Sequence, residues 1–153
     1  MRRQLATLSV VLLILSGWNP ALSAGERPFK ATYDFVGTDA VIVDDTHILF
    51  KGVLSGHATH LGRFVGETQY LVDVTTGMFE TWVTLVAANG DQLSSRGLAV
   101  FTPIGGTPTG SIGTFEFTGG TGRFADASGS GTFVGVITDE GMGTLEADGV
   151  ISF

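Results

Sequence analysis

The chain has 153 residues, contains no cysteine, and carries 15 acidic against 8 basic residues. The formal net charge of −7 argues against nucleic acid as a partner, because nucleic-acid binding depends on Lys and Arg side chains that neutralise phosphates. The lack of cysteine excludes disulfides, thiol nucleophiles and cysteine metal sites, so packing alone must stabilise the fold.

Residues 1–23 have the pattern of a secretory signal peptide, with Arg2 and Arg3, a short apolar run and an Ala-Leu-Ser stretch before the cleavage site. The apolar run is shorter than the ~18 residues of a membrane-spanning helix, which favours a removed signal over an anchor. We expect a single mature domain over residues 24–153 that is secreted or periplasmic and has no stable membrane span. Loss of Arg2 and Arg3 would take its net charge from −7 to −9.

After the signal, apolar and polar residues alternate along segments rich in β-formers, and turn residues interrupt them about every 10–15 residues. No segment has the helical period of about 3.6 residues. Asn89-Gly90 is typical of a tight hairpin turn, and the two prolines of segment 102–110 predict the longest loop. We predict eight strands, over residues 28–37, 46–57, 60–75, 78–88, 91–101, 109–118, 128–138 and 142–153.

Short connections between neighbouring strands predict an antiparallel, up-and-down order. The edge strands of an open sheet have unpaired backbone groups, and closing the sheet into a barrel removes these edges without disulfides. We therefore predict an all-β fold, an eight-stranded antiparallel up-and-down β-barrel. A two-sheet β-sandwich is the alternative. The interior of such a barrel is either filled by side chains or just wide enough for one small ligand.

The alternation also predicts which side chains face the barrel interior. In strand 78–88, either Phe79 faces inward or Glu80 and Trp82 do. We favour an inward Phe79, because that arrangement leaves the charged Glu80 side chain in water. If Glu80 faced inward instead, its buried carboxylate would be a functional candidate. The candidate ligand-binding residues of the lumen are Tyr33, Phe50, Phe64, Tyr70, Glu80 and Trp82.

Segment 119–125, GGTGRFA, satisfies the G-x-G-x-x-G/A fingerprint of dinucleotide-binding loops. That fingerprint requires a following helix whose N-terminus meets the pyrophosphate, but Gly129 and Gly131 follow too closely for a helical crossover. We therefore expect no cofactor and interpret the segment as a structural corner. In this corner the glycines accept positive φ, Phe124 caps the core and Arg123 pairs with a carboxylate. The corner residues are Gly119, Gly120, Gly122, Arg123 and Phe124.

His57 and His60 are the best candidates for metal ligands. On one strand they would point to opposite faces unless the chain turns between them, and zinc would still need a third ligand such as Glu67. We predict no metal site. We also assign no catalytic residue, since the serines lie outside any G-x-S-x-G elbow.

Three stretches together resemble a group of small exported bacterial proteins of unassigned function: GHATHLGRFVGE at 56–67, AANGDQL at 87–93 and FTGGTGRFADASGSGTF at 117–133. The GGTGRF corner and the following A-S-G are more distantly similar to the allene oxide cyclase and dirigent barrels. That resemblance implies an eight-stranded barrel that holds an apolar or phenolic small molecule. It carries over no catalytic residue.

These observations favour a non-enzymatic binding or interaction module for a small apolar ligand. One alternative is a cofactor-free isomerase or cyclase that uses an inward Glu80 together with a tyrosine. Another is a purely structural surface protein with a solid core. The sequence does not indicate an oligomeric state.

Overall fold

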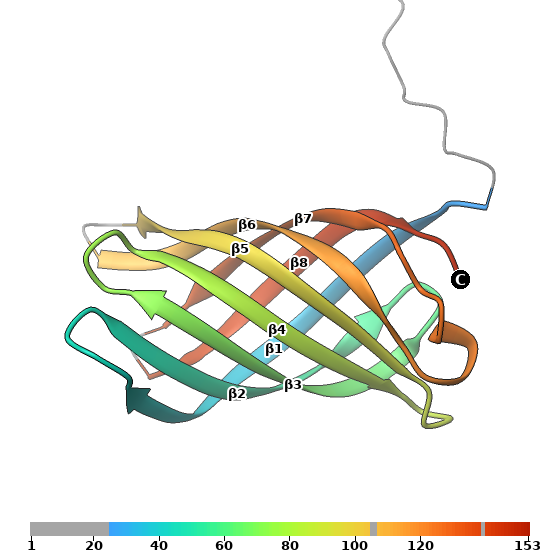
Figure 1. Ribbon diagram of the computed structural model, residues 1–153, viewed down its shortest axis with the longest axis horizontal. Helices are drawn as coiled ribbons and strands as arrows, with labels where there is room; N and C mark the ends of the chain where they lie inside the picture. Colours follow the sequence, from blue (N-terminus) through green and yellow to red (C-terminus); the bar gives the residue numbers. More distant parts are fainter. Residues whose placement is uncertain (1–24, 105–106, 139) are drawn as a thin grey trace, which may run out of the picture.

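In a computed structural model, which describes residues 25–104, 107–138 and 140–153, eight antiparallel strands close into a barrel (Figure 1). Each strand pairs with the next along the chain, and β8 pairs with β1. This confirms the predicted barrel and excludes the sandwich. The strands are β1 (Arg27–Ile42), β2 (His47–Ala58), β3 (Gly62–Asp73), β4 (Met78–Ala87), β5 (Gln92–Ile104), β6 (Thr107–Gly120), β7 (Ser130–Ile137) and β8 (Met142–Ile151).

The expected signal peptide, residues 1–23, lies outside the described residues. Within the part of the chain that the structure describes, no helix is long and apolar enough to cross a membrane.

The predicted loop over 102–110 is the main error in the strand assignment. Backbone pairing continues past Thr102 and Gly110 to the pair Ile104 and Thr107, with a register shift next to Thr102. Proline removes one backbone donor, and the irregular end of a hairpin tolerates that loss, so Pro103 can lie opposite Pro108. β1 is also longer than predicted, because a bulge after Gly37 lets it continue beside β2.

The up-and-down order places the connections at two opposite ends of the barrel. The end that we call the corner end carries the connection 121–129 and both ends of the described chain, and it lies at the right of Figure 1. The other end, which we call the hairpin end, carries the connections β1–β2, β3–β4 and β7–β8.

Aromatic side chains fill much of the interior, and inward-facing glycines make space for them. A Cβ atom on Gly52 would lie 2.2 Å from the Phe35 ring and 2.8 Å from the carbonyl oxygen of Val36. The ring therefore lies directly over bare backbone of the neighbouring strand. This alternation of large and small residues lets a narrow barrel hold many rings. The largest buried residues are Phe29, Phe35, Leu54, Leu61, Phe64, Val72, Phe79, Leu85, Leu93, Phe117, Phe124, Phe133 and Ile151.

The corner end is closed by the short 3-10 helix η1 (Gly122–Phe124). Gly119 and Gly122 have φ values of 105° and 57°, which favour glycine. The Phe124 side chain is fully buried, with its ring centroid 5.0 Å from that of Phe153. Arg123 covers the Phe124 ring, places its Nε 3.6 Å from an Asp91 carboxylate oxygen and donates a hydrogen bond to the His60 carbonyl. The segment that matched a cofactor fingerprint therefore forms a plug, without a helix long enough to bind a pyrophosphate.

Candidate ligand-binding site in the barrel lumen

A cavity of about 70 Å³ lies inside the barrel. This volume is far less than the ~300–1,000 Å³ of typical small-molecule pockets. Side chains therefore nearly fill the lumen. Rings and aliphatic groups form most of the wall, and its polar members are the hydroxyl residues Tyr33, Thr68, Tyr70, Thr81, Ser95 and Ser111. None of the described lining residues carries a carboxylate, an amine, a guanidinium or an imidazole.

Five aromatic residues, which we call the mouth cluster, lie toward the hairpin end of the barrel, and three of them, Phe35, Tyr70 and Phe79, line this cavity. Tyr70 is the centre of the cluster: its ring stacks on Phe50 at 5.0 Å and lies 5.8 Å from both Phe35 and Phe79. Phe79 in turn lies 4.6 Å from Phe101. Phe50, Tyr70 and Phe101 are only partly buried, so the cluster reaches the surface.

The corner end has no comparable opening, because buried rings and the η1 plug cover it. Phe29 packs edge-on against Phe117 at 4.9 Å, and Phe117 packs against Phe115 at 5.2 Å. Phe124 seals the barrel beyond them with no exposed surface. Among the described residues, the two ends therefore differ in how far their rings are exposed.

Tyr33 and Tyr70 are the ionisable groups in the cavity wall. Burial raises the pKa of each phenol to about 12, because the interior solvates the phenolate poorly. Both side chains are thus neutral at physiological pH. They present a ring with a hydroxyl group and do not act as bases.

Ser111 is the least satisfied polar group in the wall. Its side chain is 4% exposed, and its Oγ has no hydrogen-bond partner among the described residues. Gly135 on the neighbouring strand β7 leaves open the space next to this oxygen, since a Cβ there would lie 2.7 Å from it. Buried hydroxyls are normally hydrogen-bonded, so this one marks a place where a polar group of another molecule would be stabilised.

The predicted lumen residues separate into two groups. Tyr33 and Tyr70 line the cavity, Phe50 stacks on Tyr70, and Phe64 packs edge-on against Tyr33 at 6.0 Å. These four residues face the interior.

The inclusion of Glu80 and Trp82 in the lumen was wrong. Phe79 is 7% exposed and therefore faces inward, which is the orientation that we favoured for this strand. Because successive side chains of a strand point to opposite faces, Glu80 and Trp82 face outward. Glu80 is exposed, and Trp82 is 43% exposed. The cyclase hypothesis thereby loses the lumen carboxylate on which it depended.

The sequence analysis missed the hydroxyl residues Thr68, Thr81, Ser95 and Ser111. The signal that could have identified them is the same alternation, because Ser111 lies on the face of Phe115 and Phe117. Polar residues on a mostly apolar face were not considered as part of a site.

The surroundings of His57 and His60 are not those of a metal site. His60 lies in the β2–β3 turn with a φ of 69°, and its Nε2 is 2.9 Å from the carbonyl oxygen of Pro28. His57 faces outward on β2 and is exposed. Over the described ranges, no three His, Asp or Glu residues lie close enough together to hold a metal ion.

Comparisons with known proteins identify the fold. No protein-family profile matches the chain, and no curated protein matches its sequence. The structure of a pterocarpan synthase dirigent protein is similar to it, with a TM-score of 0.52 and 15% sequence identity over 86% of this chain and 88% of the dirigent chain. At this identity the likeness concerns the fold alone. The protein is therefore a closed, eight-stranded barrel with a dirigent-like fold, as the GGTGRF corner implied.

Proposed function

We propose that the protein is an exported, non-enzymatic binding module whose lumen takes a small apolar molecule. The cavity wall carries this proposal, because it consists of rings and aliphatic groups with a few hydroxyls and has no charged side chain. Such a wall favours an apolar ligand that is oriented by one or two polar contacts. The mature domain would be residues 24–153, released outside the cytoplasm after signal removal.

Binding would require the mouth cluster to open, since the cavity of about 70 Å³ is too small for most organic molecules. Outward rotation of Tyr70 and Phe101 would enlarge the cavity from the hairpin end. The ligand would replace the ring contacts that these side chains lose, and a polar atom of the ligand would satisfy Ser111 Oγ.

Native mass spectrometry of the protein purified from its own host tests the proposal. We expect a bound apolar compound, and a rise in melting temperature when the emptied protein is mixed with indole, naphthalene or coumarin. Ser111→Val, which replaces the hydroxyl with a methyl and adds a second methyl to the cavity, should weaken this binding about tenfold. The matched variant Ile112→Val changes the next residue of β6, which points to solvent, and should bind normally.

A solid-core structural protein is the second candidate, and the small volume of the cavity favours it. In that case the purified protein would be empty. None of the apolar probes would shift its melting temperature, and Ser111→Val would alter stability alone.

A further inference from the structure

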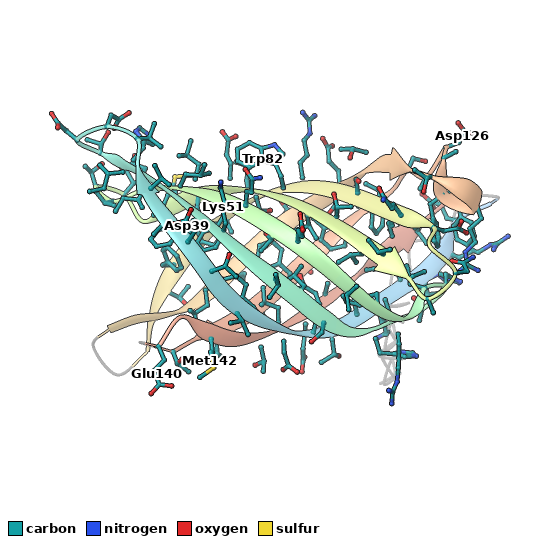
Figure 2. All side chains as sticks on the ribbon, turned by 90° about the horizontal axis from the view of Figure 1, so that it is seen from below. Asp39, Lys51, Trp82, Asp126, Glu140 and Met142 are labelled. Carbon is teal, nitrogen blue, oxygen red and sulfur yellow. The ribbon has the colours of Figure 1, made fainter. Side chains whose placement is uncertain are left out.

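The outer face of the barrel carries a row of paired side chains centred on Trp82. In this row Gln69 of β3, Trp82 of β4, Arg96 of β5 and Glu116 of β6 lie directly opposite one another across successive strands. Trp82 is 43% exposed and stands out from the barrel wall in Figure 2. An indole in the middle of a polar, solvent-facing row contributes nothing to the core, which leaves its face available for contact with another molecule.

The charged groups around Trp82 are mostly acidic. Arg96 forms an ion pair with Glu116, and the exposed carboxylates of Glu67 and Glu80 flank the row on either side. Carboxylates repel an anionic partner and accept hydrogen bonds from hydroxyl groups, which argues for an uncharged partner rich in hydroxyls.

Two shallow grooves run along this face, and Trp82 and Arg96 line both of them. The first groove adds Glu67, Gln69 and Ser94 to its wall, and the second adds Glu80 and Thr114. The indole therefore forms a ridge between two surfaces that combine hydroxyl and amide groups with carboxylates. These groups offer both donors and acceptors at short intervals.

We propose that this face binds a neutral oligosaccharide, with one sugar ring stacked on Trp82. A pyranose with equatorial hydroxyls has an apolar C–H face that packs on an aromatic ring, and its rim of hydroxyls both donates and accepts hydrogen bonds. Gln69 supplies a donor and an acceptor, Arg96 supplies donors, and Glu116 supplies an acceptor. The two grooves would hold the sugar units on either side of the stacked ring.

Titration with cellohexaose, chitohexaose and maltohexaose, followed by calorimetry and tryptophan fluorescence, tests this proposal. We expect one or more of the three to bind, with a change in the emission of Trp82. The chain has two tryptophans, Trp18 and Trp82, so the difference from Trp82→Phe isolates the signal of the indole at position 82. Trp82→Ala should weaken binding about tenfold or more, and Gln69→Ala should weaken it severalfold.

Val65→Ala is the matched control, because Val65 is an outward residue of β3 that is 62% exposed and lies outside the row. This variant should bind the sugar normally. All variants should still bind apolar probes in the lumen, so a failure here is distinct from a failure of the lumen proposal. The proposal is overturned if no hexasaccharide binds at millimolar concentration or if Trp82→Ala and Gln69→Ala bind as the wild type does. It is equally overturned if Trp82→Ala only dissociates a dimer, since the face would then be an interface between copies.

Discussion

Tyr33 and Tyr70 are the two tyrosines of the chain, so the absorbance of phenolate reports on the lumen alone. Burial raises the pKa of both from 10.0 to about 12, which means that the fold favours the neutral phenol. The stability that this adds is complete below pH 10 and is lost as the pH rises through 12. For Tyr33 it amounts to at most about 3 kcal/mol, and for the more exposed Tyr70 to less.

An alkaline absorbance titration checks this prediction. The folded protein should ionise near pH 12 and the urea-unfolded protein near pH 10. Tyr33→Phe should remove about half of the absorbance change. Ionisation of the folded protein near pH 10 would show instead that water reaches the lumen freely.

Ser111 illustrates how a single unpaired group can indicate a site. Its Oγ has no partner within the described ranges, so Ser111→Ala removes a polar atom without breaking a bond of the protein. We expect the free energy of unfolding of the ligand-free protein to stay unchanged or to rise by about 1 kcal/mol, as measured by urea denaturation.

Thr59→Ala is the contrast to Ser111→Ala, because Thr59 Oγ1 accepts a hydrogen bond from the Lys30 amide at 2.9 Å. Its removal should cost about 1 kcal/mol. A large loss of stability in Ser111→Ala would instead mean that the hydroxyl already has a partner in the empty protein.

At the scale of elements, the η1 corner is the clearest test of how the barrel is closed. Phe124 has no exposed surface and fills the corner end. Phe124→Ala should therefore lower the free energy of unfolding by about 3–5 kcal/mol. Arg123→Ala removes a half-exposed ion pair with Asp91, a hydrogen bond to the His60 carbonyl and the cover over the Phe124 ring, and should cost less, about 1–2 kcal/mol. Urea denaturation of the two variants would contradict this assignment if Arg123→Ala were the more damaging one.

The strands were predictable because each keeps one apolar face, and a period of two is visible in a single sequence. The same pattern assigned Tyr33, Phe50, Phe64 and Tyr70 to the interior. It was ambiguous only in β4. There the face that contains Phe79 and the face that contains Trp82 both carry apolar residues. The loop predicted over 102–110 failed because proline weakens a strand without forbidding backbone pairing at the end of a hairpin.

The candidate site was less predictable than the strands. Which inward residues meet across the lumen depends on the stagger between strands, and alternation carries no information about stagger. The mouth cluster joins Phe35, Phe50, Tyr70, Phe79 and Phe101, which come from five different strands. Only the register of the closed sheet brings these rings together. The unpaired hydroxyl of Ser111 likewise depends on the open space that Gly135 leaves on the next strand.

At the scale of the whole molecule, the two ends of the barrel have different roles. The corner end joins a buried phenylalanine, an arginine and the C-terminal Phe153 into a plug. At the hairpin end, the described residues include the mouth cluster, in which Phe50, Tyr70 and Phe101 are partly exposed. The charged side chains that line the barrel wall lie on its outside, in accord with a chain of net charge −7 around an apolar lumen. The proposed access to the lumen and the proposed recognition on the outer face would therefore be separate properties of one fold.

This asymmetry predicts where a ligand enters. Tyr70 contacts three other rings of the mouth cluster, so Tyr70→Ala should open the hairpin end and speed the uptake and release of naphthalene about tenfold or more, as followed by stopped-flow fluorescence. Phe153→Ala removes a comparable amount of ring contact at the corner end, but Phe124 still closes the barrel there. The uptake and release rates of Phe153→Ala should therefore match those of the wild type. Faster exchange in Phe153→Ala alone would place the entrance at the corner end. No uptake by any of the three proteins would establish the solid core, because even a barrel without its mouth would then admit nothing.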